Sequence, residues 1–268
     1  MSELTFLNAI ILGIVEGLTE FLPISSTGHM LIVDAFLKNK YSDAFYILIQ
    51  IGPIAACALV FWKDIVNFFV NWDKPETRDY VLKLFVAFFI TCIGGLIAKI
   101  LGLKLPETIL PVALAVLLGA FVIFAVEIKA KKKVLSETLT WGIVFAVAAG
   151  QLIAAVFPGA SRSGMAIMGA LLLGFARPNA VKFAFLVGIP TMFAAGTLEL
   201  FKEIRAENTA GLFTFEAIIA YIVATITAWL SVVWLMKFVQ TKNFIPFAWY
   251  RVVLGVVLLV LFACGIIS

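Results

Sequence analysis

The amino-acid sequence predicts an all-α polytopic membrane protein with six transmembrane helices, two re-entrant helical hairpins and an inverted-topology repeat. Three observations predict this class. The chain of 268 residues is 63% hydrophobic and only 13% charged, and its mean hydropathy is +1.10. It contains six apolar runs of roughly 20 residues, each long enough to cross a hydrocarbon core about 30 Å thick. Its two halves also carry matching motifs.

The six apolar runs predict the transmembrane helices. We expect these helices at residues 44–62, 80–103, 109–127, 183–201, 213–236 and 246–267. Polar and basic residues separate the runs, so each run is expected to be a separate span.

Matching landmarks recur at similar spacing in the two halves. Glu16 stands seven positions before Pro23, and Gln151 stands seven positions before Pro158. Each proline opens a short polar run, PISSTGH in the first half and PGASRSG in the second. Later landmarks also match: Pro53 with Pro190, Pro111 with Pro246, and Gly119 with Gly255. We therefore expect a single membrane domain, 1–268, built from two copies of one unit.

A pair of shorter helical segments precedes the three spans of each half. These pairs lie at 4–22 with 29–37, and at 138–157 with 165–175. The apolar residues of 4–22 gain roughly 5 kcal/mol on insertion, which is about what Glu16 and Glu20 cost together. Irregular backbone is tolerated at membrane depth only inside protein, so both pairs are predicted to be re-entrant hairpins. Because each copy has three spans, the copies 1–135 and 136–268 are expected to be inverted relative to each other.

The distribution of basic residues predicts the orientation. With the loop containing Lys129 and Lys133 in the cytoplasm, eleven basic residues face that side: Lys63, Lys74, Arg78, Lys129, Lys131, Lys132, Lys133, Arg177, Lys182, Lys237 and Lys242. The six on the other side are Lys38, Lys40, Lys99, Lys104, Lys202 and Arg205. Cytoplasmic loops carry the excess of Lys and Arg, so the first hairpin is expected to open toward the extracytoplasmic side. The 129–133 cluster abuts a span and is interpreted as a membrane anchor rather than a nucleic-acid-binding patch.

Two carboxylates lie at the expected membrane depth in the segment 16–29, EGLTEFLPISSTGH. A charged group there costs about 2.5 to 3.5 kcal/mol even on permissive insertion scales, so intramembrane acids are usually functional. Glu16 and Glu20 are four residues apart and share one helix face. Such a pair suits a hard divalent cation, Mg²⁺ or Ca²⁺, or general acid–base catalysis. Two carboxylates solvated in a cavity are the structural alternative.

Polar residues precede the second helix of each hairpin, at 25–27 and 161–163. Helix capping alone would explain the hydroxyls. Two helix N-termini that meet also favour an anion such as phosphate, and the planar guanidinium of Arg162 matches phosphate oxygens in pairs. The expected phosphate-binding residues are Ser25, Thr27, Gly28, Ser161, Ser163 and Gly164. An ion pair of Arg162 with Glu16 or Glu20 is the structural alternative.

The only histidine, His29, lies at the mouth of this expected phosphate site. Imidazole acts as a nucleophile or a base near neutral pH, and Ser26 is a hydroxyl one turn away. The sequence favours Ser26 as the nucleophile with His29 as its base, and attack by His29 itself stays open. A histidine-based zinc site is excluded because ligands are lacking.

The motifs EGLTEFLPISSTGH and PGASRSG, with the chain length and the duplicated halves, strongly resemble the bacterial undecaprenyl-diphosphate phosphatase family, whose members are associated with bacitracin resistance. The resemblance covers essentially the whole chain. It implies a protein of the bacterial inner membrane that hydrolyses undecaprenyl diphosphate to undecaprenyl phosphate and inorganic phosphate, recycling the lipid carrier for peptidoglycan synthesis.

The resemblance also implies site roles and a divalent cation, Mg²⁺ or Ca²⁺. By motif, Glu16 and Glu20 correspond to the family's essential acidic pair. Ser26 and His29 correspond to its candidates for nucleophile and base, and Arg162 to its phosphate-binding arginine.

The main alternative is a secondary transporter or a lipid flippase for a polyprenyl diphosphate, because inverted repeats with broken helices typify transporters. Membrane phosphatases of the phosphatidic-acid type also contain a PSGH-like stretch. Their mechanism needs two histidines, whereas this chain has one. The expected partners are membrane lipid and a polyprenyl diphosphate whose tail lies in apolar grooves between spans. A homodimer is left open.

Overall fold

The computed structural model describes residues 5–37, 41–103, 105–132, 134–206 and 214–266. Within these ranges the regular secondary structure is helical, apart from one isolated bridge between Ser136 and Phe175. The helices are α1 Phe6–Glu20, α2 Ser26–Leu37, α3 Asp43–Val60, α4 Trp62–Val70, α5 Pro75–Ile100, α6 Ile109–Ala130, α7 Trp141–Val156, α8 Arg162–Leu172, α9 Arg177–Arg205, α10 Phe215–Thr241 and α11 Ile245–Ala263. Some residues that mark predicted ends or loop charges lie outside the described ranges: Leu4, Lys38, Lys40, Lys104, Lys133, Phe213 and Ile267.

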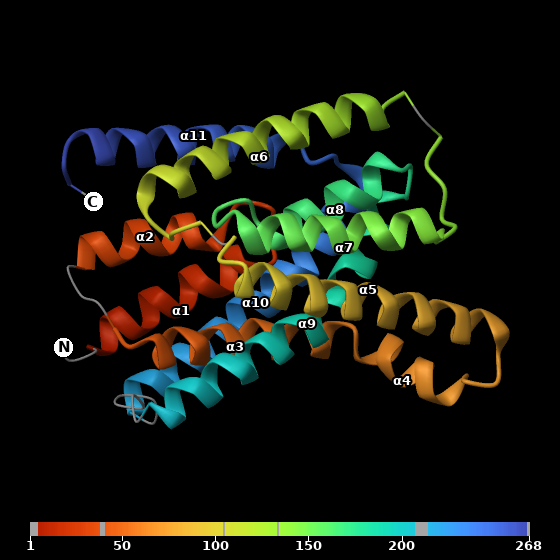
Figure 1. The fold of residues 1–268 in the computed structure, drawn as a ribbon, viewed down its shortest axis with the longest axis horizontal. Coiled ribbons are helices and arrows are strands. Elements are labelled where there is room, and N and C mark those ends of the chain that lie inside the picture. Colours follow the sequence, from red (N-terminus) through yellow and green to blue (C-terminus); the bar gives the residue numbers. More distant parts are fainter. Residues whose placement is uncertain (1–4, 38–40, 104, 133, 207–213, 267–268) are drawn as a thin grey trace.

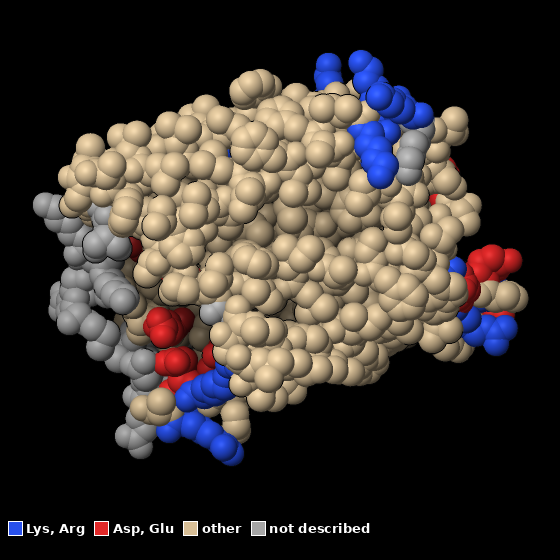
Figure 2. Space-filling model, turned by 45° about the horizontal axis from the view of Figure 1, so that its top comes forward, with Lys and Arg blue, Asp and Glu red and all other residues tan. Residues whose placement is uncertain are grey.

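Six helices are long and apolar enough to cross a membrane, which confirms the predicted spans. They are α3, α5, α6, α9, α10 and α11. Large apolar side chains such as Phe89 and Ile93 of α5 are more than half exposed, as expected for surfaces that face lipid. Figure 2 shows charged side chains at the two ends of one face of the molecule and an uncharged band between them. The chain is a multi-pass membrane protein.

Helix α4 was not predicted, and it shortens the first span to Val60. Phe61 separates α3 from α4, and none of the nine residues of α4 is buried. Trp62 is 59% exposed and Phe69 is 78% exposed. Asp64 forms an ion pair with Lys182 of α9. An exposed amphipathic helix of this kind suits the membrane–water interface. Because α4 begins with an apolar residue, hydropathy alone extended the predicted first span into that residue, Trp62.

The two predicted pairs of short helices are present as α1 with α2 and α7 with α8, and the helices of each pair contact one another. With 15 residues, α1 is roughly 22 Å long, which is less than the thickness of a hydrocarbon core. In Figure 1, α1 and α2 extend from one end of the long axis toward the middle, and α7 and α8 extend from the other end. The two interhelical turns, 21–25 and 157–161, therefore lie deep in the molecule.

Small residues let α1 pack closely on α10. A Cβ atom added to Gly13 would lie 2.6 Å from the carbonyl oxygen of Ala220, and one added to Gly17 would lie 2.4 Å from that of Ala224. Close backbone approach at small residues is the usual basis of helix association in membranes, where lipid removes the hydrophobic drive between helices. This contact places the C-terminal end of α1, which carries Glu16 and Glu20, beside a membrane-spanning helix.

Helices of the two sequence halves contact one another in matched sets. Helix α1 packs on α10 and α7 packs on α5; α3 packs on α10 and α9 packs on α5. Similarly, α8 contacts α6 and α2 contacts α11, while α3 meets α9 and α6 meets α11. If α1, α2, α3, α5 and α6 are matched in order with α7 to α11, each of these contacts between the halves has a counterpart. The halves are thus interleaved, and both interhelical turns are enclosed by spans from both.

Candidate active site

Both interhelical turns contain a serine with a positive φ angle. Ser25 has φ 75° and Ser161 has φ 69°, and these are the non-glycine residues of the described chain with this backbone conformation. A positive φ angle costs a residue that has a side chain about 1 to 3 kcal/mol, and residues with this conformation are found mainly at functional sites. The hydroxyl of Ser25 accepts a hydrogen bond from the backbone N–H of Gly28 (3.2 Å), and that of Ser161 accepts one from Gly164 (3.2 Å). The capping alternative therefore holds for these two serines.

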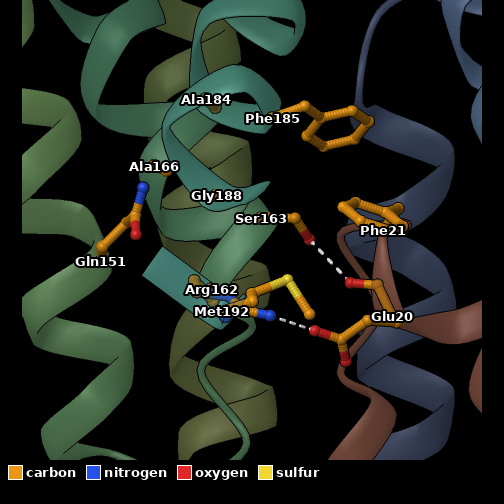
Figure 3. Close-up of a pocket in the computed structure, with 10 residues that line it drawn as sticks. All are labelled: Glu20, Phe21, Gln151, Arg162, Ser163, Ala166, Ala184, Phe185, Gly188 and Met192. Carbon is orange, nitrogen blue, oxygen red and sulfur yellow. Dashed lines mark hydrogen bonds and ion pairs between the residues drawn. The ribbon is translucent and has the colours of Figure 1, made fainter. Parts of the chain in front are cut away.

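An ion pair joins the two turns. Arg162, in the first turn of α8, contacts the carboxylate of Glu20 at the end of α1. The Ser163 hydroxyl donates to the backbone oxygen of Leu22 at 3.3 Å. Figure 3 shows Arg162 and Ser163 directed at Glu20 from the opposite hairpin. The structure thus brings together Glu20 and Arg162, which are 142 positions apart in sequence.

Ser26 belongs to the same group of side chains. Its hydroxyl donates to the second carboxylate oxygen of Glu20, at 2.6 Å between Oγ and Oε2. The carboxylate of Glu20, whose side chain is only 9% exposed, therefore bridges a hydroxyl and a guanidinium. A hydroxyl bonded to a carboxylate base, beside a cation that binds phosphate oxygens, can carry out phosphoryl transfer.

His29 is held by other groups. Its Nδ1 lies 2.7 Å from the carbonyl oxygen of Ser25, and its Nε2 lies 2.7 Å from the hydroxyl of Tyr250, whose ring stacks on the imidazole. A carbonyl oxygen only accepts, so Nδ1 carries a proton and Nε2 of the neutral ring accepts from Tyr250. The expected activation of Ser26 by His29 is not seen in the described structure, where the Ser26 hydroxyl bonds to Glu20 instead. Thr27 lies half-buried in the first turn of α2.

Glu16 lies one turn before Glu20 and is 2% exposed. Its Oε1 has no hydrogen-bond partner among the described residues. An unpartnered buried carboxylate oxygen is costly, and an oxygen donor of this kind fits a hard divalent cation. Within the described ranges, no three His, Cys, Asp or Glu side chains are grouped as metal ligands. Mg²⁺ often uses one or two carboxylates and completes its shell with substrate phosphates and water, so the two glutamates fit such an ion.

Arg251 is a residue that the sequence analysis missed. It lies in α11, is fully buried, and donates to the backbone oxygens of Val116 (3.1 Å) and Ala115 (3.2 Å) in α6. It also donates to those of Gly159 (3.1 Å) and Pro23 (3.4 Å), one in each interhelical turn. The guanidinium of Arg251 thus links both interhelical turns to α6 and α11. An arginine within a predicted apolar run was the sequence signal that would have identified it.

The pocket beside the ion pair is small. Polar residues Glu20, Gln151, Arg162 and Ser163 line it together with apolar residues of α8 and α9. Its free volume of about 10 Å³ is close to that needed for one water molecule. A diphosphate is therefore too large for this pocket as it stands.

Comparisons with known proteins show the family of the chain. The family model for bacitracin resistance protein BacA matches residues 9–257. An undecaprenyl-diphosphatase of Rhizobium etli is 45% identical over 264 residues, covering 98% of this chain and 99% of that protein. One of Xylella fastidiosa is 45% identical over 258 residues (94% and 97%), and one of Xanthomonas oryzae pv. oryzae is 44% identical over 265 residues (97% of each). The chain, with its paired strained turns joined by Glu20 and Arg162, therefore belongs to the bacitracin resistance protein BacA family.

Proposed function

We propose that this chain is an undecaprenyl-diphosphate phosphatase. It hydrolyses undecaprenyl diphosphate to undecaprenyl phosphate and inorganic phosphate and so returns the lipid carrier to peptidoglycan synthesis. The names of the relatives support this assignment. The observation that carries it is the contact of Glu20 with both Ser26 and Arg162 at the junction of the two hairpins.

In the proposed reaction, Arg162 exchanges Glu20 for oxygens of the terminal phosphate. The Ser26 oxygen attacks the terminal phosphorus while its proton passes to Glu20. The bond from phosphorus to the bridging oxygen breaks, and the polyprenyl monophosphate leaves. Water then cleaves the phosphoserine, releases inorganic phosphate and restores the hydroxyl. A carboxylate that accepts the proton of an attacking hydroxyl is a recurring part of phosphoryl transfer.

This mechanism assigns the base role to Glu20 rather than to His29. Glu20 already accepts a hydrogen bond from the hydroxyl it would deprotonate. The Nδ1–H of His29 donates to the Ser25 carbonyl and its Nε2 accepts from Tyr250, so attack by Nε2 would first break the Tyr250 contact. The neutral ring instead holds the strained turn at Ser25, which positions Ser26.

We further propose that Glu16 and Glu20 hold a divalent cation, Mg²⁺ or Ca²⁺. A bound cation would offset the charge of the phosphate oxygens in the transition state. Support comes from the buried Oε1 of Glu16, which has no partner in the described part of the chain. Glu16 would supply this free oxygen, and Glu20 would supply the Oε1 that Arg162 leaves on binding phosphate, while its Oε2 stays on Ser26.

The proposed membrane arrangement is an inverted repeat with two re-entrant hairpins. The matched contacts between the halves, and the matched positive φ angles of Ser25 and Ser161, support it. In the bacterial inner membrane, the excess of basic residues on the side of 129–133 places the opening of the first hairpin on the periplasmic side.

An apolar groove beside the first hairpin suits the polyprenyl tail. Its volume is about 450 Å³, and its lining residues are Leu18, Thr19, Leu22, Ile24, Trp234, Phe238, Pro246, Phe247 and Tyr250. Tyr250 also bonds His29, which bonds the Ser25 carbonyl, and Ile24 lines the groove, so the groove borders the first interhelical turn. A tail in this groove would leave the headgroup between the turns.

Replacing Ser26 with alanine tests the proposed function. The purified protein in detergent is expected to release inorganic phosphate from undecaprenyl diphosphate, and Ser26→Ala to lose at least about 10³-fold in kcat, because no nucleophile remains. Ser136→Ala, at the connection between α6 and α7, is the matched control and is expected to retain activity. Mass spectrometry of quenched wild-type reactions should detect phosphoserine at Ser26. Phosphohistidine at His29, or full activity of Ser26→Ala, would contradict the mechanism.

The same protein reconstituted in vesicles separates hydrolysis from transport. A phosphatase releases inorganic phosphate whether or not the lipid changes leaflet. Movement of polyprenyl diphosphate between leaflets without release of phosphate would favour the transporter or flippase alternative.

Removal of divalent cations is expected to abolish hydrolysis, and Mg²⁺ or Ca²⁺ to restore it. Glu16→Gln removes one charged ligand, so the cation concentration for half-maximal activity should rise about tenfold, which corresponds to 1.4 kcal/mol. Glu216→Gln, at a partly exposed position in the first turn of α10, is the control. Wild-type activity that persists in excess EDTA would rule out the cation.

A further inference from the structure

The amide of Gln151 in α7 is buried and unsatisfied. The residue is 2% exposed, and neither its Nε2 nor its Oε1 has a hydrogen-bond partner among the residues that the structure describes. Leaving a buried polar group without a partner costs about 1 to 3 kcal/mol, and native proteins contain few of them. Such a side chain either contacts a ligand or water, or it destabilises the protein to no purpose.

Gln151 lines the pocket that contains the ion pair. Figure 3 shows it projecting from α7 on the side of Arg162 opposite Phe21, with its amide near Ala166. The other polar residues in the lining are already paired: Arg162 with Glu20, and Ser163 with the backbone of the first hairpin. The Gln151 amide is the buried part of this polar lining that forms no hydrogen bond with the described residues. Because the rest of the lining is apolar, a hydrogen bond formed here is poorly screened.

In the sequence duplication, Gln151 occupies the position in the second half that matches Glu16 in the first. Each stands seven residues before the proline of its turn, Pro158 or Pro23. A carboxylate at this position suits a cation, but it would repel a phosphate bound to Arg162. An amide offers two N–H donors without that repulsion. The two halves therefore present different chemistry at matching positions: an acid in α1 and a neutral donor in α7.

We infer that Gln151 is a phosphate-binding residue, whose Nε2 donates to an oxygen of the diphosphate headgroup once that headgroup replaces Glu20 on Arg162. The inference rests on the proposed function and adds a residue that the two motifs do not contain. It divides the site into a cation side at Glu16 and an anion side at Gln151 and Arg162. A single buried water molecule bonded to the amide is the competing explanation, and the variants below separate the two.

Gln151→Met is the first test, because methionine is similar in size and makes no strong hydrogen bond. Its melting temperature should equal or exceed that of the wild type, since an unsatisfied amide is removed. Its KM for undecaprenyl diphosphate, and its dissociation constant for inorganic pyrophosphate measured by thermal shift, should each rise about tenfold. Gln240→Met, at the exposed end of α10, is the matched control. Wild-type values of both constants in Gln151→Met would overturn the inference and favour a bound water.

Gln151→Glu is the second test. It is the deciding test in the case that Gln151→Met does not fold. An ionised carboxylate would repel the headgroup, so KM should rise more than tenfold near neutral pH. At lower pH the carboxyl becomes neutral and can donate, so the ratio of variant to wild-type KM should fall. A ratio near one at every pH would overturn the inference.

Failure of the inference is distinct from failure of the proposed function. If the wild type releases no phosphate from prenyl diphosphates, the proposed function fails, and the inference fails with it. If the wild type hydrolyses them and both Gln151 variants bind pyrophosphate normally, only the role of Gln151 is wrong.

Discussion

Arg162→Lys is expected to lower kcat/KM by about 10² to 10³-fold while leaving the fold intact. Lysine keeps the positive charge that neutralises Glu20, but its ammonium is a point charge without the planar fork that contacts two phosphate oxygens at once. The loss should appear mainly in kcat, because the transferring phosphoryl group carries its charge on oxygens that the fork contacts in the transition state. The rate of inorganic phosphate release from undecaprenyl diphosphate measures this loss.

Two further variants separate chemistry from stability in this experiment. Arg162→Ala leaves the carboxylate of Glu20, 9% exposed, without its cation, which typically costs about 3 to 5 kcal/mol. This variant should therefore lose stability as well as activity. Arg205→Lys, at the exposed end of α9, should match the wild type in both. If Arg162→Lys retained kcat/KM within threefold of the wild type, the guanidinium would have no special part in phosphate binding.

Gly119→Ala is expected to destabilise the protein, although the same change normally stabilises a helix by about 1 kcal/mol. A Cβ added to Gly119 would lie 2.0 Å from Nη2 of Arg251 and 2.6 Å from its Cζ. Overpacking of this kind costs about 1 to 3 kcal/mol. A displaced guanidinium also leaves backbone oxygens in both interhelical turns unsatisfied, at about 1 to 3 kcal/mol each. Thermal unfolding in detergent should show the loss, and kcat should fall because the turns carry Ser26 and Arg162.

A double-mutant cycle with Arg251→Met tests whether Arg251 causes this effect. If the guanidinium is the group that the new methyl displaces, Gly119→Ala should cost less in the Arg251→Met background, with a coupling of at least about 1 kcal/mol. Gly95→Ala in α5 is the control, because nothing lies within 4 Å of its added Cβ. Costs that add within about 0.5 kcal/mol would mean that the two residues do not act together.

Much of the architecture was predictable because it depends on local properties. The six spans follow from apolar runs whose length matches the bilayer, and the two helix pairs break at Pro23 and Pro158 as expected. The pairing of Arg162 with Glu20 was one of the alternatives that the motifs left open. In each case the signal was a charge, a proline or a run length that can be read without knowing which helices are neighbours.

Other parts of the site depend on neighbours that the sequence does not name. The sequence favoured His29 as the partner of Ser26, since the two lie one turn apart, but the hydroxyl bonds to Glu20 across the turn. The positive φ of Ser25 changes the direction of the chain there. Tyr250, which bonds His29, is 221 positions away in sequence. Periodicity gives no information on contacts at that separation.

The sequence by itself determined that this is a membrane protein with six spans, two broken helix pairs and a cluster of acids, hydroxyls and one arginine at the breaks. It could do so because the cost of placing polar groups in hydrocarbon acts on each segment separately. Only the tertiary structure decided that Glu20 serves both Ser26 and Arg162, that Arg251 joins the two turns, and that Gln151 faces the same pocket. Lateral packing of helices made these choices. It depends on close contacts at small residues such as Gly17 and Gly119, and the sequence does not show which helix each of them contacts.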